Sequence, residues 1–298
     1  MRKEAEILSH QLAPNDVISL LNKSSAPFAN HISIPTGAAI NLDSSETSIA
    51  SKFTQSLEAL DLGKSSTSSN QPINKKETEL NFGSPQIDLS LPEGTLAKDG
   101  LHEFNPKHFK DQDLAFKIAL TLAAREVNSP SSKPIFCFLT EDQTNLINWL
   151  SSIEIEKLGL SKENLILITA KHTDDLLWAM EETIHSVEAT ALVAHFTLLN
   201  NISAQRLAFA AKTHKVPYLL ICNHKIDGPN HSKSKWTIWS TTETPNCETS
   251  LNQEKQIELT LSQIQNEEQN SNWTIKWQAE KGRFVTSKKE TEISATVH

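Results

Sequence analysis

Apolar positions between residues 80 and 223 follow two alternating patterns. Short runs in which almost every residue is apolar are typical of strands that are buried on both faces of a sheet. The stretches between these runs place apolar residues three and four apart, as in an amphipathic helix. Strands that alternate with helices in this way predict an α/β fold with a mostly parallel sheet. The predicted strands are PIFCFL (134–139), NLILITA (164–170), ATALVAHF (189–196) and VPYLLICN (216–223), and the predicted helices are 113–127, 143–158, 173–187 and 203–214.

The first 79 residues have a different pattern. Residues 4–22 predict one or two short amphipathic helices, and residues 24–79 are rich in Ser, Thr, Asn and Gln. Such a composition offers too little apolar surface to offset the entropy of ordering, so residues 1–79 are expected to form helices and a disordered linker. One apolar island, IASKFTQSLEALDLG (49–63), predicts a lone helix within this linker.

The chain after residue 223 returns to strand-like alternation. KWTIW (235–239) predicts a strand that completes a core of residues 80–240. Residues 241–298 are expected to hold a low-complexity segment with a weak helix up to about residue 270, then a hairpin and a polar tail. The hairpin is predicted from NWTIKWQAEKGRFVTSKK, with its turn at Lys281-Gly282, and a short helix, a turn and a strand are predicted between residues 80 and 104.

Composition limits the classes of function. The chain has 298 residues, a net charge of −8 and a pI of 5.8, which provides no basic footprint for direct binding to duplex DNA. The apolar runs are too short to cross a membrane and the first residues do not resemble a signal peptide, so a cytoplasmic protein is expected. Three isolated cysteines have neither metal-ligand nor redox spacing.

Candidate chemistry is concentrated in GLHEFNPKHFKDQDLAFKIALTLAAR (100–125), which predicts a strand, a turn and a long helix. A phosphate loop at such a turn needs glycines, because their backbone N–H groups must reach phosphate closely, and it needs a lysine and a hydroxyl. This turn has no glycine. Pro106 removes one donor, and Asp111 and Asp113 would repel phosphate at the helix N-terminus. The turn therefore predicts a phosphate loop that has lost its function.

Several segments together resemble the RecA-type core and, more narrowly, the ImuA family of RecA-like accessory proteins in bacterial induced mutagenesis. The resemblance covers roughly residues 80–240, with weaker support at 271–290. It implies a RecA-like three-layer core with a mostly parallel sheet flanked by helices, a degenerate P-loop and a C-terminal β-hairpin. The segments that carry it include GLHEF (100–104), FLTEDQTNLINWLSSIEIEKLGLSKENLILI (138–168), LWAMEE (177–182) and WTIKW (273–277).

The resemblance also implies where a nucleotide site would lie. The vestigial acid positions are Asp142, after the second core strand, and His195, where the family pattern has the acid of the magnesium shell. Histidine is a poor substitute there because magnesium prefers oxygen ligands. Hydrolysis, a cofactor and a metal are therefore not expected, and His224 and His231 are assigned to a solvated loop. The vestigial phosphate-loop positions are Asn105, Lys107, Lys110 and Asp113.

The function that the resemblance implies is a non-catalytic adaptor in damage-induced translesion synthesis. Its expected partner is ImuB, a Y-family polymerase relative, with RecA and an error-prone C-family DNA polymerase as further candidates. Contact with DNA would be indirect, no membrane is involved, and self-association is left open. The alternatives are an ATPase with an unusual loop built on Lys107 and Lys110, and a division inhibitor like SulA. Candidate partner-binding residues, for which core packing is the competing interpretation, are Trp178, Glu181, Trp273, Trp277 and Arg283.

Overall fold

The computed structural model describes residues 38–42, 53, 55–57, 80–127, 133–186, 188–224, 229–241, 256–265, 267–278, 280 and 283–286. These residues form one ten-stranded sheet with the order β1-β4-β3-β5-β6-β2-β7-β8-β9-β10. Neighbouring strands are parallel from β1 through β7, and the pairs from β7 to β10 are antiparallel. The strands are β1 (Ala38–Leu42), β2 (Leu101–Pro106), β3 (Ile135–Thr140), β4 (Leu165–Ala170), β5 (Ala191–Phe196), β6 (Tyr218–Cys222), β7 (Ser234–Thr241), β8 (Gln256–Ile264), β9 (Glu267–Gln278) and β10 (Arg283–Thr286).

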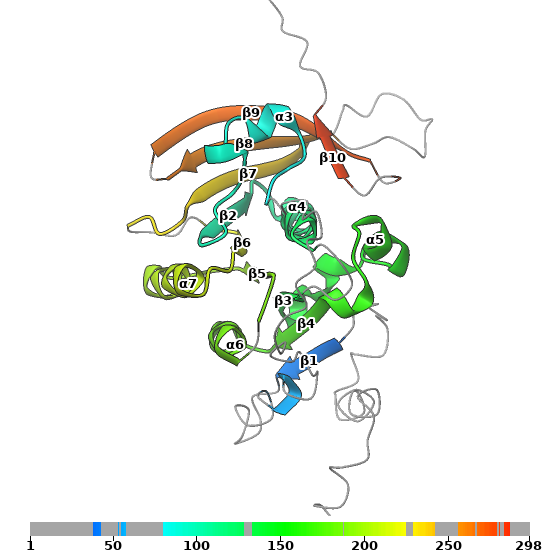
Figure 1. Ribbon diagram of the computed structural model, residues 1–298, viewed down its shortest axis with the longest axis vertical. Helices are drawn as coiled ribbons and strands as arrows, with labels where there is room; N and C mark the ends of the chain where they lie inside the picture. Colours follow the sequence, from blue (N-terminus) through cyan, green and yellow to red (C-terminus); the bar gives the residue numbers. More distant parts are fainter. Residues whose placement is uncertain are drawn as a thin grey trace, which may run out of the picture.

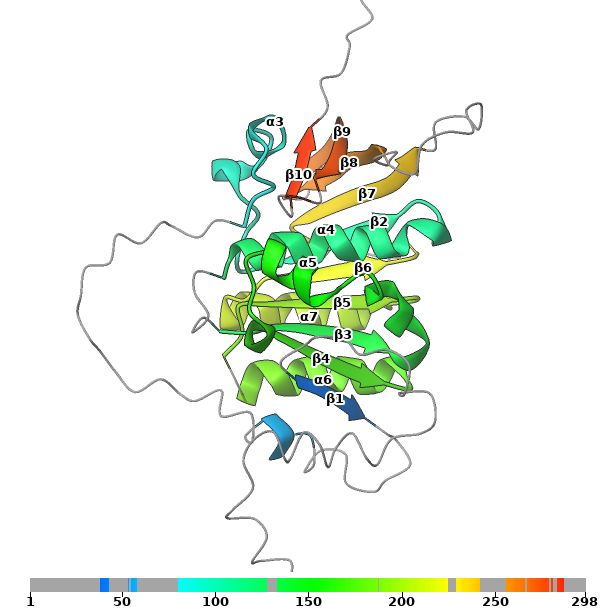
Figure 2. The same cartoon turned by 90° about the vertical axis from the view of Figure 1, so that its right-hand side faces the viewer.

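Helices cover both faces of the parallel part of the sheet, which gives a three-layer α/β arrangement. Figure 1 shows α4 and α5 on one side and α6 and α7 on the other, and Figure 2 shows the strands stacked between them. The helices are α3 (Pro85–Asp88), α4 (Gln112–Arg125), α5 (Ser152–Lys157), α6 (Thr173–Ser186) and α7 (Asn201–His214), with 3-10 turns at Pro92–Gly94, Phe109–Asp111, Glu141–Ile147 and Lys162–Asn164.

The central strands are buried on both faces because their residues are almost all apolar. Every residue of β3, β5 and β6 is buried. One apolar cluster joins the sheet to α4 and to the antiparallel strands, and a second joins it to α6 and α7. The predicted α/β class and mostly parallel sheet are confirmed. Among the helices that the structure describes, none is long and apolar enough to cross a bilayer.

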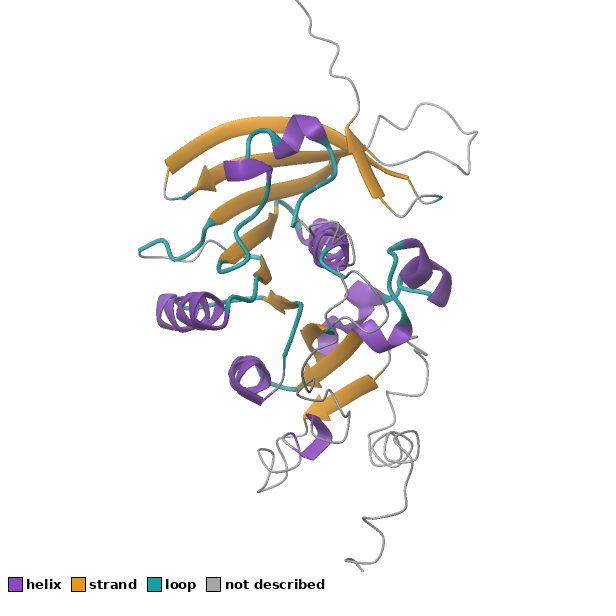
Figure 3. Ribbon diagram, in the orientation of Figure 1, coloured by secondary structure: helices purple, strands orange, loops and turns teal. Residues whose placement is uncertain are grey.

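The antiparallel end of the sheet differs from the sequence-based prediction. Instead of a weak helix, residues 256–264 form β8, which pairs with β7 and β9 (Figure 3). The reason is a period of two: Ile257, Leu259 and Leu261 are buried while the residues between them are half-buried. The predicted C-terminal hairpin is present as β9 and β10, which pair from Gln278↔Arg283, although the turn residues 281 and 282 lie outside the described residues.

The single helix predicted over 143–158 is divided into two pieces. A 3-10 turn covers Glu141–Ile147, where the backbone N–H of Thr140 donates to the side chain of Gln143 at 3.1 Å. The helix α5 then begins separately, because the Ser151 hydroxyl caps it by accepting from the N–H of Glu154 at 3.2 Å.

Two described pieces of the first 79 residues belong to the core, whereas the sequence predicts a disordered linker that contains one lone helix. The strand β1 (Ala38–Leu42) pairs in parallel with β4 at the edge of the sheet. Phe53 and Leu57, from the predicted lone helix, are both 1% exposed and pack in the same apolar cluster as α6. Burial of Phe53 and Leu57 stabilises their contact with the core. The predicted helices within residues 4–22 lie outside the described residues.

Candidate functional site

A crevice opens at the carboxyl ends of the parallel strands. The connection after β3 runs to the face that carries α4 and α5, and the connection after the neighbouring β5 runs to the face that carries α6 and α7. Such a divergence is where ligands bind in open α/β sheets. A pocket of about 320 Å³ lies there, lined by Phe109, Lys110, Gln112, Asp113, Asp142, Gln143, Asn145, Leu146, His195, Thr197 and Asn223.

The turn between β2 and α4 sends its side chains in two directions. The ammonium group of Lys107 lies 4.3 Å from the centre of the Trp239 ring on β7. Asp111 is buried, and its Oδ1 accepts from the backbone N–H and the hydroxyl of Ser240 at 3.1 and 2.7 Å. These contacts tie the turn to β7. Of the charged side chains in the turn, Lys110 and Asp113 line the pocket.

The end of β3 contributes a second carboxylate. The Thr140 hydroxyl donates to Oδ1 of Asp142 at 2.5 Å, which holds this acid beside the strand end. Gln143 crosses to the end of β5, where its Nε2 donates to the hydroxyl of Thr197 at 3.1 Å. The carboxylate of Asp142 remains exposed, so this part of the pocket is acidic and open to solvent.

His195 forms the floor of the site at the end of β5 and is 1% exposed. Its Nε2 donates to Oδ1 of Asn223 at 3.1 Å, which leaves Nδ1 as an acceptor. Nδ1 is buried and has no hydrogen-bond partner among the described residues. Burial lowers the pKa of His195 to about 4, and the hydrogen bond to Asn223 and the charge of Asp142 oppose that shift only in part. The imidazole is therefore neutral at pH 7.

The structure brings together four of the six predicted vestigial positions. Lys110, Asp113, Asp142 and His195 line one pocket. Lys107 points instead to Trp239, and Asn105 lies within β2 with its Oδ1 buried and unpaired among the described residues. The sequence-based prediction omits Thr197 and Asn223, which directly follow β5 and β6, a position that could have marked them. It also omits Gln112, at the start of α4, and Gln143, in the turn after β3.

In the described part of the chain, no group of three or more His, Cys, Asp or Glu side chains lies close enough together to hold a metal ion. His231, assigned to a solvated loop from the sequence, is half-buried, and its ring Nε2 is 3.2 Å from Oδ1 of Asn201. His224 is exposed.

His102, in GLHEF (100–104), makes hydrogen bonds with both ring nitrogens near the start of β2. Its Nε2 donates to the carbonyl of Ala97 and its Nδ1 accepts from the Ser234 hydroxyl, both at 2.8 Å. The indole N–H of Trp236 donates in turn to the Ser234 oxygen. His102 is thus a fully satisfied, buried structural residue.

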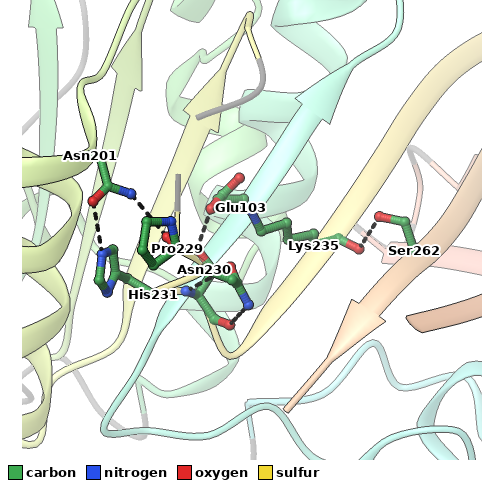
Figure 4. A network of polar contacts seen from close by, with 8 residues as sticks. Glu103, Asn201, Pro229, Asn230, His231, Lys235 and Ser262 are labelled. Atoms are coloured by element: carbon green, nitrogen blue, oxygen red, sulfur yellow. Dashed lines mark hydrogen bonds and ion pairs between the residues drawn. The ribbon is translucent and has the colours of Figure 1, made fainter. Parts of the chain in front are cut away.

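Glu103 in the same segment lies in a polar network (Figure 4). Its carboxylate accepts from the hydroxyl of Ser232 and lies 3.2 Å from the ammonium group of Lys235, and Glu103 is 2% exposed. Nearby, Asn201 at the start of α7 donates to the carbonyl of Pro229. The network joins β2 to the approach to β7, and Glu103 does not line the pocket beside Phe109.

The five predicted partner-binding residues lie in two separate regions. On α6, Trp178 packs edge-on against Phe53 at 5.3 Å, and Glu181 pairs with Arg206 at 2.5 Å. The other three lie on β9 and β10 at the far end of the sheet (Figure 1).

Core packing accounts for much of the tryptophan surface on β9. Trp273 and Trp277 are both half-buried against the core, as their shared face with Ile275 predicts. The indole N–H of Trp273 donates to the carbonyl of Gln86 at 3.0 Å. Arg283 is exposed.

No protein-family model matches the chain, and no curated protein matches it significantly.

Proposed function

We propose that this protein is a non-catalytic, RecA-like adaptor resembling ImuA, which supports damage-induced translesion synthesis by binding a Y-family-like partner such as ImuB. RecA and an error-prone C-family polymerase are further partners in this proposal, and contact with DNA is indirect. The observation that carries the proposal is the chemistry of the crevice. The positions that a RecA-type nucleotide site would use converge there, yet they present Asp113, Asp142 and a neutral His195.

The order of strands and helices from β2 to β6 supports the RecA-like part of the proposal. The segments that resemble the RecA core fall on consecutive strands and helices of one three-layer unit, from β2 to β6. The turn after β2 and the acids after β3 meet at one edge of the sheet, as a nucleotide site requires.

The residues of the turn after β2 and of the pocket lining support an adaptor rather than an ATPase. The turn from Asn105 to Asp113 contains no glycine, and Lys107 is held against Trp239 outside the pocket lining. Lys110 is then the one lysine among the lining residues, opposed by two carboxylates. A triphosphate would meet net negative charge at the N-terminus of α4, where a working site concentrates positive charge.

Nucleotide binding is tested by thermal unfolding with and without magnesium ATP. A ligand at about 100 times its Kd stabilises a protein by about 2.7 kcal/mol. We expect no rise in Tm at millimolar nucleotide, and the same result for Lys110→Ala. A rise that Lys110→Ala abolishes would instead support the ATPase alternative.

Partner binding is tested by pull-down with purified ImuB-like protein and RecA at micromolar concentration. We expect retention of the ImuB-like protein, and loss of induced mutation when the gene is deleted. Failure with both partners, together with cell filamentation on expression, would favour the SulA-like alternative.

A further inference from the structure

The crevice presents hydrogen-bond acceptors and negative charge. Its lining contains two carboxylates, Asp113 and Asp142, and one ammonium group, Lys110. Because His195 is neutral, these charges sum to −1. All three charged side chains are exposed, so a ligand can reach them from solvent. The charge favours a cationic ligand and opposes an anionic one.

Two buried polar atoms of the lining lack partners among the described residues. Nδ1 of His195 is an acceptor, because Nε2 carries the proton that Asn223 accepts. Nε2 of Gln112 is a donor on a side chain that is 5% exposed. Buried polar atoms are normally paired, and a ligand in the pocket that reaches these two atoms would satisfy both. That ligand must supply a hydrogen-bond donor to His195 and an acceptor to Gln112.

Two large apolar side chains are exposed, one in the lining of the pocket and one next to a lining residue along the chain. Phe109, itself part of the lining, is 84% exposed, and Leu198, next to the lining residue Thr197, is 69% exposed. Large exposed apolar side chains around a polar pocket are typical of surfaces that bind another protein. A free metal ion or a small polar molecule would leave both of them uncovered.

We propose that this pocket binds an arginine side chain from an apolar segment of the partner protein. This inference rests on the proposed function and states how the adaptor holds its partner. The guanidinium group would pair with Asp113 and Asp142 and donate to Nδ1 of His195. A backbone carbonyl of the same segment would accept from Gln112, and neighbouring apolar side chains would cover Phe109.

Arginine fits better than lysine because its planar group carries five donors in a fixed arrangement and is more weakly hydrated. The acceptors come from three different elements, the start of α4, the end of β3 and the end of β5, so a ligand with several divergent N–H groups is needed. The ordinary place of a phosphate would thereby hold a group of the opposite charge.

The probe is the peptide acetyl-Leu-Arg-Phe-amide, with a matched peptide in which neutral, nearly isosteric citrulline replaces arginine. Binding to the full chain is followed by the ring nitrogen resonances of His195, assigned with His195→Gln. We expect the arginine peptide to shift these resonances and to bind roughly tenfold more tightly than the citrulline peptide, because it makes charge-assisted hydrogen bonds.

Three variants of exposed side chains give the sign of the electrostatics. Asp113→Asn and Asp142→Asn should each reduce the affinity for the arginine peptide roughly two- to fivefold, as for exposed ion pairs. Lys110→Ala should raise the affinity for the arginine peptide, because it removes a positive charge from the lining. If the pocket bound an anion, the same substitution would lower the affinity. Equal binding of the two peptides, no shift at the highest soluble concentration, or weaker binding by Lys110→Ala overturns the inference.

Pull-down of the ImuB-like protein with the double variant Asp113→Asn/Asp142→Asn separates this inference from the proposed function. We expect the double variant to retain much less partner than the wild-type chain. Equal retention would overturn the arginine pocket and leave the adaptor function standing. If the wild-type chain fails to retain the partner but still binds the arginine peptide, the adaptor function falls and the pocket stands.

Discussion

The ammonium group of Lys117 lies 4.1 Å from the centre of the Trp277 ring. The same group lies 4.6 Å from the ring of Trp149, so one lysine of α4 contacts a strand of the C-terminal hairpin and the turn before α5. Burial lowers the pKa of Lys117, and the nearby acids Glu154 and Asp113 oppose that shift. The pair of cation–π contacts connects the antiparallel end of the sheet to its parallel centre.

Lys117→Met is expected to lower the free energy of unfolding by about 1 kcal/mol, because it keeps the length of the side chain and removes the cation. Lys117→Arg should stay close to wild type, since guanidinium also stacks on aromatic rings. Urea denaturation with tryptophan fluorescence measures both. A Lys117→Met protein as stable as the wild type would show that the contacts contribute nothing net.

Phe53→Ala should lower the free energy of unfolding by roughly 3–5 kcal/mol, the usual range for a buried phenylalanine. Phe53 is 1% exposed and packs against Trp178, so the fluorescence of that tryptophan should also change. The matched control is Gln55→Ala, in the same helical stretch but exposed. If the two variants unfold alike, the segment does not belong to the core.

Asp111→Ala should be destabilised by roughly 1–3 kcal/mol, because the two Ser240 donors at the end of β7 lose their acceptor. Asp111→Asn keeps an acceptor oxygen and should cost less. Asp113→Ala, only two positions away but exposed, should change stability little. Chemical denaturation of the three proteins checks the order, and a larger loss for Asp113→Ala would contradict it.

Acid should weaken the fold before the carboxylates titrate. Burial lowers the pKa of both His102 and His195 from 6.5 to about 4. Between these values the unfolded chain takes up protons that the folded chain does not, so stability falls as pH drops through this window. Each histidine should lower the free energy of unfolding by about 1.4 kcal/mol for each pH unit of acidification within this window.

The measurement is the urea midpoint at several pH values between 6 and 5. His102→Gln and His195→Gln should each remove about half of this slope. Unchanged slopes in both variants would show that the two rings titrate alike in the folded and unfolded chains.

The parallel centre of the sheet could be predicted from sequence because its signal is local. Runs such as 134–139 and 216–223 are apolar at nearly every position, which at that length is typical of a strand buried on both faces. The resemblance to the RecA core predicts Asp142 and His195 at one site, and both line the pocket.

Features that depend on distant contacts could not be predicted in the same way. Ala38–Leu42 is a short segment in a polar region and becomes a strand by pairing with β4, more than 120 residues away. The sequence groups Lys107 with Lys110 because both precede α4, but the ammonium group of Lys107 lies over the Trp239 ring on β7 and Lys107 does not line the pocket. The sequence likewise places Asp111 at a phosphate site, whereas its carboxylate accepts hydrogen bonds from Ser240.

The two outermost strands of the sheet, β1 and β10, are also the first and last strands along the described chain. Each has one side without a neighbouring strand within the described sheet. An edge strand could therefore be added or lost beside β1 or β10, while the central strands that shape the crevice keep their neighbours. A change confined to β1 or β10 would therefore leave β3 and β5, whose ends shape the crevice, between the same inner strands.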